Sequence, residues 1–162
     1  MFAPEASSAV NESAEPELII GASAVAIDGR AILIEGPPGS GKSSLCLALI
    51  ETGAQLIGDD GALVSRRDDL VIIGPPPRAT GLIEVRGIGL ASMAVAEPCR
   101  LSLILSIVDT TEAEPQTLPE RLPEQAPVRE VLGCPIPCSP FIPGAIAPAA
   151  RARWALKLHG LA

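Results

Sequence analysis

Residues 30–44 read Arg30-Ala31-Ile32-Leu33-Ile34-Glu35-Gly36-Pro37-Pro38-Gly39-Ser40-Gly41-Lys42-Ser43-Ser44, and this stretch decides the fold. It contains the pattern G-x-x-x-x-G-K-S without a gap at residues 36–43. One apolar run precedes the pattern at 31–34, and another follows it at 45–50. Strand, glycine-rich loop and helix in that order are the context that a phosphate-binding P-loop requires.

This pattern suits an anion because of the backbone conformation that it allows. Glycines let successive N–H groups turn toward one anion without clashes from Cβ atoms, and the following helix points its positive end at the same place. Lys42 supplies a cation for the β and γ phosphates, and Ser43 supplies an oxygen for Mg²⁺. A plain glycine-rich turn is the alternative. The expected nucleotide-binding residues are Gly36, Pro37, Pro38, Gly39, Ser40, Gly41, Lys42, Ser43 and Ser44.

Length and composition favour one domain with an aliphatic core. The chain has 162 residues, 48% of them hydrophobic but only 2% aromatic, which is enough for a sizeable core. No apolar run approaches the roughly 20 residues that span a bilayer, and no signal peptide is recognisable. A cytoplasmic protein without membrane contact is therefore expected. The net charge of −7 disfavours nucleic acid as a partner.

Two segments differ in composition from the rest. Residues 1–17 carry glutamates but no basic residue, which predicts a flexible acidic leader before a single domain at 18–162. Residues 110–148 are rich in proline and glutamate, which predicts a largely irregular segment. The cysteines are expected to be reduced, and the spacing of Cys134 and Cys138 is not typical of a zinc site.

The turn Asp28-Gly29 lies between two apolar runs, 24–27 and 31–34. This is a strong hairpin signal, so the P-loop strand is expected to pair antiparallel with the strand before it. The sequence therefore predicts an α/β fold with a P-loop, a mixed sheet with antiparallel hairpins, and few helices.

Other elements follow from apolar patterning. A helix is expected at 42–52, where Gly53 would end it. Further strands are expected at 54–58, 62–65, 70–73, 82–90 and 101–108, the second and third of these as a hairpin. A closing helix is expected at 149–161, with the apolar Trp154, Leu158 and Leu161 on one face and the basic Arg151, Arg153 and Lys157 on a solvated side.

Phosphoryl transfer needs a phosphate cradle, a divalent cation and a group that deprotonates the acceptor hydroxyl. Asp59 and Asp60 follow the first strand after the P-loop helix. Short β-α-β spacing is expected to bring that strand end beside the P-loop. The alternative for this pair is a turn between strands.

Three more charged residues are candidates. Glu84 lies in a strand between two apolar residues, so it could face a site or face water. Arg86 begins a glycine-containing segment suited to charge neutralisation, but could equally be a surface cation. Asp109 ends an apolar run and is a minor alternative as a metal-binding acid.

Three stretches resemble the catalytic core of bacterial HPr kinase/phosphorylase: residues 36–43, Gly58-Asp59-Asp60, and the signature-like segment Leu82-Ile83-Glu84-Val85-Arg86-Gly87-Ile88-Gly89. The resemblance is good over about 19–109. It implies a C-terminal catalytic domain with a P-loop kinase core related to phosphoenolpyruvate carboxykinase. It also implies ATP and Mg²⁺ as cofactors, an HPr-like phosphocarrier protein as partner, and a homo-oligomer, since the family is often hexameric.

The resemblance implies roles for the matched residues. Asp59 would be the base for the acceptor serine of HPr and the acid in the reverse, phosphorylase reaction. Asp60 would assist at the metal, and Glu84 would be a further Mg²⁺ ligand. Arg86 would lie near the transferred phosphate, while Lys42 and Ser43 keep the roles given above.

The sequence departs from the family in three places. The chain is too short for the family's additional N-terminal domain, so it resembles the short form found in alphaproteobacteria. The family has a histidine before the P-loop strand that partners the catalytic aspartate, and a gapless alignment places Gly21 there. The arginine-bearing loop tied to dephosphorylation is not recognisable in 110–130.

Three functions are consistent with these features. The first is an ATP-dependent serine kinase acting on HPr. The second is a non-catalytic nucleotide-binding module that signals through a phosphocarrier or sensor-kinase partner, which Gly21 favours. The third is a small-molecule kinase. A GTPase is disfavoured because the chain has no Asn-Lys-x-Asp segment.

Overall fold

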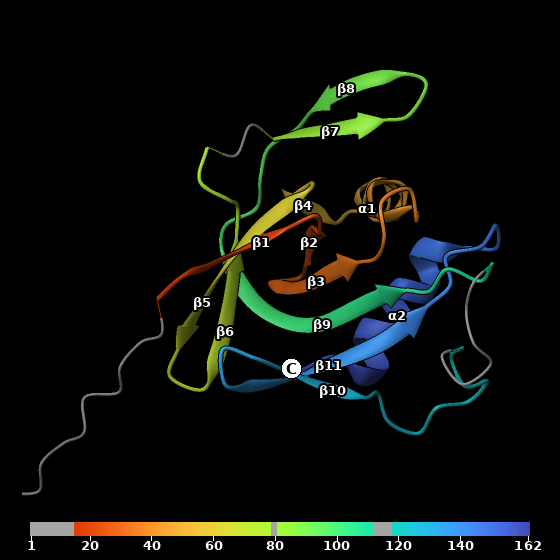
Figure 1. The fold of residues 1–162 in the computed structure, drawn as a ribbon. Coiled ribbons are helices and arrows are strands. Elements are labelled where there is room, and N and C mark those ends of the chain that lie inside the picture. The colour runs from red at the N-terminus through yellow and green to blue at the C-terminus, as the bar shows by residue number, and fades with distance from the viewer. Residues whose placement is uncertain (1–14, 79–80, 112–117) are drawn as a thin grey trace, which may run out of the picture.

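The computed structural model describes residues 15–78, 81–111 and 118–162 (Figure 1). The regular elements in these ranges are β1 (Glu17–Ile20), β2 (Ser23–Ile27), β3 (Arg30–Glu35), α1 (Lys42–Glu51), β4 (Gln55–Gly58), β5 (Gly61–Arg67), β6 (Leu70–Gly74), β7 (Leu82–Val85), β8 (Gly89–Ser92), β9 (Cys99–Ile107), β10 (Val128–Val131), β11 (Cys134–Phe141) and α2 (Pro148–His159). Most of the predicted acidic leader lies outside the described residues.

The main sheet is organised around β9. Its strand order is β1-β5-β6-β9-β3-β2-β4. β3 pairs parallel with β9 along most of its length, while β6 pairs antiparallel with the start of β9 and β11 pairs parallel with its end. Because β6 and β11 diverge from one strand, the sheet splits, and β9 is strongly curved (Figure 1). β7 and β8 form a separate two-stranded sheet. The predicted mixed α/β architecture is confirmed.

The predicted hairpin before the P-loop is also confirmed. Ile27 pairs with Arg30 across the turn, and Asp28 and Gly29 have φ values of 50° and 76°, as a tight hairpin turn requires. β4 pairs antiparallel with β2, and β2 pairs antiparallel with β3. β3 and β4 therefore run in the same direction, and their carboxyl ends reach the same edge of the sheet.

The core is aliphatic and covers both faces of β3. Ile32 and Ile34 pack in one cluster with residues of α1 and α2, whereas Leu33 belongs to the cluster on the opposite face. All three are fully buried, and burial of each such side chain stabilises the fold by roughly 1.5–3 kcal/mol. In the part of the chain that the structure describes, no helix has the length and apolar character needed to cross a bilayer.

The prediction of a largely irregular 110–148 was wrong for its second half. β10 and β11 form an antiparallel hairpin there, although β11 contains Pro135, Pro137 and Pro140. The first half of β11 pairs only with β10 and the second half only with β9. Each half thus has an open side, where a proline without an N–H costs no hydrogen bond of the sheet. Residues 118–127 contain no regular element, while 112–117 lie outside the described residues.

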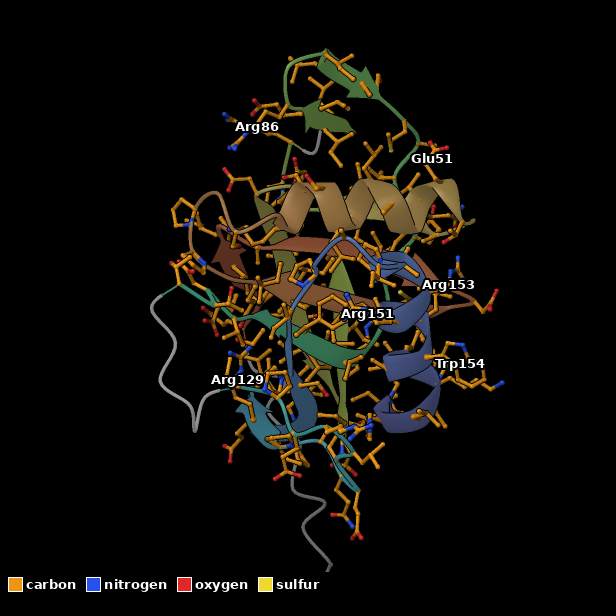
Figure 2. The ribbon with its side chains drawn as sticks, turned by 90° about the vertical axis from the view of Figure 1, so that its right-hand side faces the viewer. Glu51, Arg86, Arg129, Arg151, Arg153 and Trp154 are labelled. Atoms are coloured by element: carbon orange, nitrogen blue, oxygen red, sulfur yellow. The ribbon has the colours of Figure 1, made fainter. Side chains whose placement is uncertain are left out.

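The predicted closing helix exists, and Arg151 and Lys157 are exposed as expected, but the prediction of its apolar face was wrong. The buried residues of α2 are Ala149, Ala152 and Leu156. Trp154 and Leu158 are 54% and 68% exposed, and Figure 2 shows Trp154 projecting outward. The small alanine side chains let α2 pack closely on the sheet and α1, so the bulky residues that dominate the periodicity remain outside.

Two arginines of α2 bind backbone carbonyl oxygens. Arg151 donates hydrogen bonds to the carbonyls of Ile142 and Ile146. Arg153 donates to Oγ1 and the carbonyl oxygen of Thr52, at distances of 2.8 and 2.6 Å. Since Thr52 caps the C-terminus of α1, Arg153 ties the two helices together.

Candidate active site

A cavity of about 400 Å³ lies in front of the N-terminus of α1. Its walls come from three separate stretches of chain: the P-loop and α1, the end of β4, and the β7–β8 hairpin. The lining residues are Pro38, Gly39, Gly41, Lys42, Ser43, Ser44, Asp59, Asp60, Glu84 and Arg86. The structure therefore brings together the predicted carboxylates, Arg86 and most of the predicted P-loop residues. Gly36, Pro37 and Ser40 do not line it.

Glycine is required at specific points of the loop. A Cβ atom at Gly36 would lie 2.7 Å from Oγ of Ser40, and Gly41 has a φ of 96°. Gly41 precedes α1, and no side chain caps that end of the helix. The first amide groups of α1 are therefore left for another acceptor, and an anion is the natural one.

Lys42 lies across the loop that it follows. Its Nζ donates to the carbonyl oxygens of Gly36 and Pro37, at 2.8 and 3.0 Å. An ammonium group has three N–H donors, so one remains for a phosphate oxygen. The side chain is thereby held at the mouth of the loop.

Asp59 is the most highly connected acid of the cavity. Its Oδ1 accepts hydrogen bonds from Oγ of Ser43 and Oγ of Ser23, both at 2.8 Å. Ser43 belongs to the P-loop pattern, but sequence reasoning missed Ser23. Asp59 also affects Cys46 of α1: burial raises the pKa of the Cys46 thiol, and the charge of Asp59 raises that pKa further.

Asp60 is exposed and has a φ of 65°, a left-handed conformation that aspartate tolerates better than most residues. Its carbonyl oxygen accepts a hydrogen bond of 3.0 Å from the amide of Gly21. Gly21 has a φ of 75°, and a Cβ atom there would meet nothing within 4 Å. The position where the resemblance implies a histidine is thus adjacent to Asp60, with open space around the Cβ position.

The β7–β8 hairpin presents Glu84 and Arg86 to the cavity. Ile83 is fully buried in the cluster that contains Leu45 and Leu49 of α1. Alternation along β7 leaves Glu84 on the exposed side. Figure 2 shows Arg86 near the N-terminal end of α1, opposite Glu51 at its C-terminal end. Glu84, for which the sequence left both a site and the solvent open, is exposed and also lines the cavity.

Asp109 lies elsewhere. It lines a different cavity of about 350 Å³, together with Pro37 and Ser40 of the loop. Its Oδ1 accepts hydrogen bonds from the amide and Oγ1 of Thr111, which lower the pKa of Asp109. The structure therefore gives it a turn-forming role and does not bring it together with Asp59.

A second connection missed from the sequence holds the start of the loop. Arg129 of β10 donates from both terminal nitrogens to the two carboxylate oxygens of Glu35, each at 2.7 Å. These bonds to Glu35 raise the pKa of the Arg129 guanidinium. Glu35 is the last residue of β3, directly before Gly36. No local pattern could have paired two residues so distant in sequence.

The oxygen donors suit Mg²⁺. Hydroxyl and carboxylate oxygens from Ser43, Asp60 and Glu84 line the same cavity, and Mg²⁺ in phosphate sites is commonly held by one or two carboxylates together with the phosphates. Within the described ranges, no group of three or more His, Cys, Asp or Glu residues could hold a metal alone. A metal would therefore depend on the phosphates for part of its coordination.

The sequence profile of the HPr Serine kinase C-terminal domain matches residues 13–145. The chain belongs to this family. The HPr kinase/phosphorylase of Bordetella pertussis is 40% identical over 116 residues, which cover 67% of this chain and 37% of that protein. The HPr kinase/phosphorylase of Enterococcus faecalis is 45% identical over 67 residues, covering 41% of this chain and 22% of that protein. The chain thus spans only about a third of the length of the Bordetella relative.

A solved structure supports the same family. The structure of the Hpr(Ser) kinase/phosphatase from Coxiella burnetii aligns with a TM-score of 0.73 and 25% identity, covering 87% of this chain and 94% of that chain. The family likeness read from the signature segment is confirmed. The curled mixed sheet with few helices is the architecture that this HPr kinase family member shares, and it fits the expected relation to phosphoenolpyruvate carboxykinase.

Proposed function

We propose that the chain is an ATP- and Mg²⁺-dependent kinase that phosphorylates a serine of an HPr-like phosphocarrier protein. One observation carries the proposal: Asp59 is hydrogen-bonded to Ser43 of the P-loop helix and lines one cavity with Lys42, Glu84 and Arg86. A phosphate-binding loop and an acid group at hydrogen-bond distance from it are the parts that phosphoryl transfer needs. Membership of the HPr serine kinase family supports HPr as the acceptor.

The P-loop amides and Lys42 would bind the β and γ phosphates of ATP. Ser43, Asp60 and Glu84 would hold Mg²⁺, which when bound neutralises charge on the phosphates. Because Ser43 donates its hydroxyl proton to Asp59, the lone pairs of its oxygen stay available for the metal.

Asp59 would act as the general base. Its Oδ1 is taken by two hydroxyl donors, so Oδ2 is the atom left to accept the proton of the acceptor serine. The serine oxygen then bonds to the γ-phosphorus while the bond to the β–γ bridging oxygen breaks, and ADP leaves. Arg86 would stabilise the negative charge on the transferred group. Phosphorolysis of the phosphoserine would use the same groups in reverse, with Asp59 as the acid.

The second candidate is a non-catalytic nucleotide-binding module. Gly21 favours it, because the histidine that the family resemblance implies beside the catalytic aspartate is missing. Such a module would bind ATP and signal through a phosphocarrier or sensor-kinase partner without transferring phosphate.

Incubation with [γ-³²P]ATP, Mg²⁺ and purified HPr from the same organism separates the two. Labelled HPr with the wild-type chain, and none with Lys42→Ala, is the result expected of the kinase. Bound nucleotide without labelled HPr would favour the module, and label on a metabolite alone would favour a small-molecule kinase. The proposal also includes a cytoplasmic location. It further includes a homo-oligomer, whose mass light scattering would measure.

A further inference from the structure

We propose that Ser23 is a positioning residue for Asp59, and that it fixes the carboxylate with Oδ2 toward the acceptor hydroxyl. This inference rests on the proposed kinase function. Ser23 is the first residue of β2 and only 1% exposed. Its Oγ donates to Oδ1 of Asp59 at 2.8 Å, and it does not line the cavity itself. Its contribution therefore goes through Asp59, without contact to a nucleotide.

The sheet explains how Ser23 reaches the aspartate. β2 is the strand between β3 and β4, and Ala24 pairs with Gly58, the residue before Asp59. The register shifts just after this pair, between Ala24 and Val25. The residue at the start of β2 is thus beside the carboxyl end of β4. A hydroxyl on β2 and a carboxylate after β4 meet at the edge where the P-loop also begins.

Two serine hydroxyls from different elements donate hydrogen bonds to the same oxygen, Oδ1 of Asp59. Ser43 donates from α1 and Ser23 donates from β2, each at 2.8 Å. A carboxylate oxygen has two lone pairs for such bonds, so Oδ1 is fully used. Rotation of the carboxylate would break both bonds. Ser43 also faces the cavity, where a metal and phosphates would compete for it, whereas Ser23 is buried away from that competition.

The behaviour of the other buried serine sets Ser23 apart. Among the described residues, Ser23 and Ser102 are the two buried polar side chains. Ser102 donates to the carbonyl of Arg100, two residues away on its own strand, at 3.4 Å. That local bond serves only the fold. Ser23 instead bonds a carboxylate from another strand, 36 residues away in sequence. Ser102 is therefore the matched control.

The test compares Ser23→Ala, Ser23→Thr and Ser102→Ala in the full chain. The kcat and KM for MgATP in HPr phosphorylation are measured with the thermal midpoint of each variant. Ser23→Ala is expected to lower kcat about tenfold, the effect of losing roughly one hydrogen bond's worth of transition-state positioning. KM for MgATP is expected to stay near the wild-type value. Ser23→Thr, which retains the hydroxyl, is expected to recover most of kcat, and Ser102→Ala is expected to keep it.

The outcomes separate this inference from the kinase proposal. If the wild-type chain labels HPr and Ser23→Ala has the same kcat as Ser102→Ala, Ser23 has no positioning role, whether or not Ser23→Thr folds. A Ser23→Ala variant that loses MgATP affinity and kcat in parallel would also overturn the inference, since it would indicate a general structural defect. Absence of transfer by the wild-type chain would reject the kinase proposal itself.

Discussion

Oγ of Ser43, in the first turn of α1, lies 2.8 Å from Oδ1 of Asp59 at the end of β4. This hydrogen bond joins the helix that follows the glycine-rich loop to the acid group through two side chains, 16 positions apart in sequence. Movement of α1 relative to β4 would displace both the hydroxyl that is proposed to bind the metal and the proposed base. The hydroxyl proposed to bind the metal and the proposed base are thus linked by a direct hydrogen bond.

Asp59→Asn is expected to abolish transfer while leaving ATP binding largely intact. The amide oxygen of asparagine can still accept the hydroxyls of Ser23 and Ser43, so the local structure is retained. The amide cannot take the proton of an acceptor serine, and loss of a general base commonly costs about 10²–10⁴ in rate. Radiolabelled transfer and equilibrium binding of a fluorescent ATP analogue measure the two properties separately. Transfer at the wild-type rate would show that Asp59 is not the base.

The ion pair between Arg129 and Glu35 is expected to contribute more to ATP affinity, by holding the start of the P-loop, than to the free energy of unfolding. Both side chains are partly exposed, so either Glu35→Ala or Arg129→Ala should cost at most about 1 kcal/mol of unfolding free energy. ATP affinity should nevertheless fall, because Glu35 leads directly into Gly36. Arg129→Lys should restore it only partly, since lysine cannot make two parallel hydrogen bonds.

The double variant and a matched surface pair provide the controls. Glu35→Ala with Arg129→Ala should bind ATP no more weakly than either single variant, because the two residues act as one unit. Asp69, which is almost fully exposed and lies 3.7 Å from Arg66, should tolerate Asp69→Ala without effect on binding. Independent, additive losses from Glu35 and Arg129 would contradict the proposed tether.

Cys46 is expected to resist thiol reagents in the folded chain. Burial raises the pKa of its thiol, and the charge of Asp59 adds to the rise. Since the thiolate is the reactive form, the folded protein should react with iodoacetamide at Cys46 far more slowly at pH 8 than a urea-unfolded sample. Mass spectrometry of peptides after timed labelling gives the rate at each cysteine. Equal rates in the two samples would show that Cys46 is accessible as thiolate.

The parts of the fold that could be predicted from the sequence have local signals. The turn Asp28-Gly29 and the glycines of the P-loop have conformational requirements that few other residues meet, so the hairpin and the loop followed directly. Asp59 could be related to the P-loop because two strands that run in the same direction end at one edge. Glu84 needed the resemblance to a family signature, since its alternating pattern is equally typical of a solvent-facing position.

The remainder depends on contacts that have no local signal. Ser23 is a small residue in a run of small residues, and its role depends on its hydrogen bond to Asp59, which follows β4. Arg129 and Glu35 meet through β10, in a segment whose prolines argued against any strand. Trp154 dominates the apolar pattern of α2, yet the space beside α1 suits alanine. In each case the role of the residue depends on which other part of the chain packs against it, and the local sequence does not contain that information.

Gly21 occupies the position where the family resemblance implies a histidine. The backbone there has a φ of 75° and no atom within 4 Å of a Cβ, so Gly21→His meets no steric obstacle but costs roughly 1–2 kcal/mol of backbone strain. The amide of residue 21 already bonds the carbonyl of Asp60, so the backbone that would carry the imidazole lies beside the backbone of Asp60. We expect Gly21→His to lower the thermal midpoint slightly and to raise kcat for HPr phosphorylation.

Gly21→Asn is the matched control, because asparagine tolerates left-handed backbone but cannot act as a base or an imidazolium. It should reproduce the small loss in thermal midpoint without the gain in kcat. A wild-type chain that transfers slowly and a faster Gly21→His variant would mean that the glycine limits an otherwise complete kinase site. If Gly21→His and Gly21→Asn have identical kcat values, the missing histidine is not what sets the rate, and Ser23 and Ser43 suffice to orient Asp59.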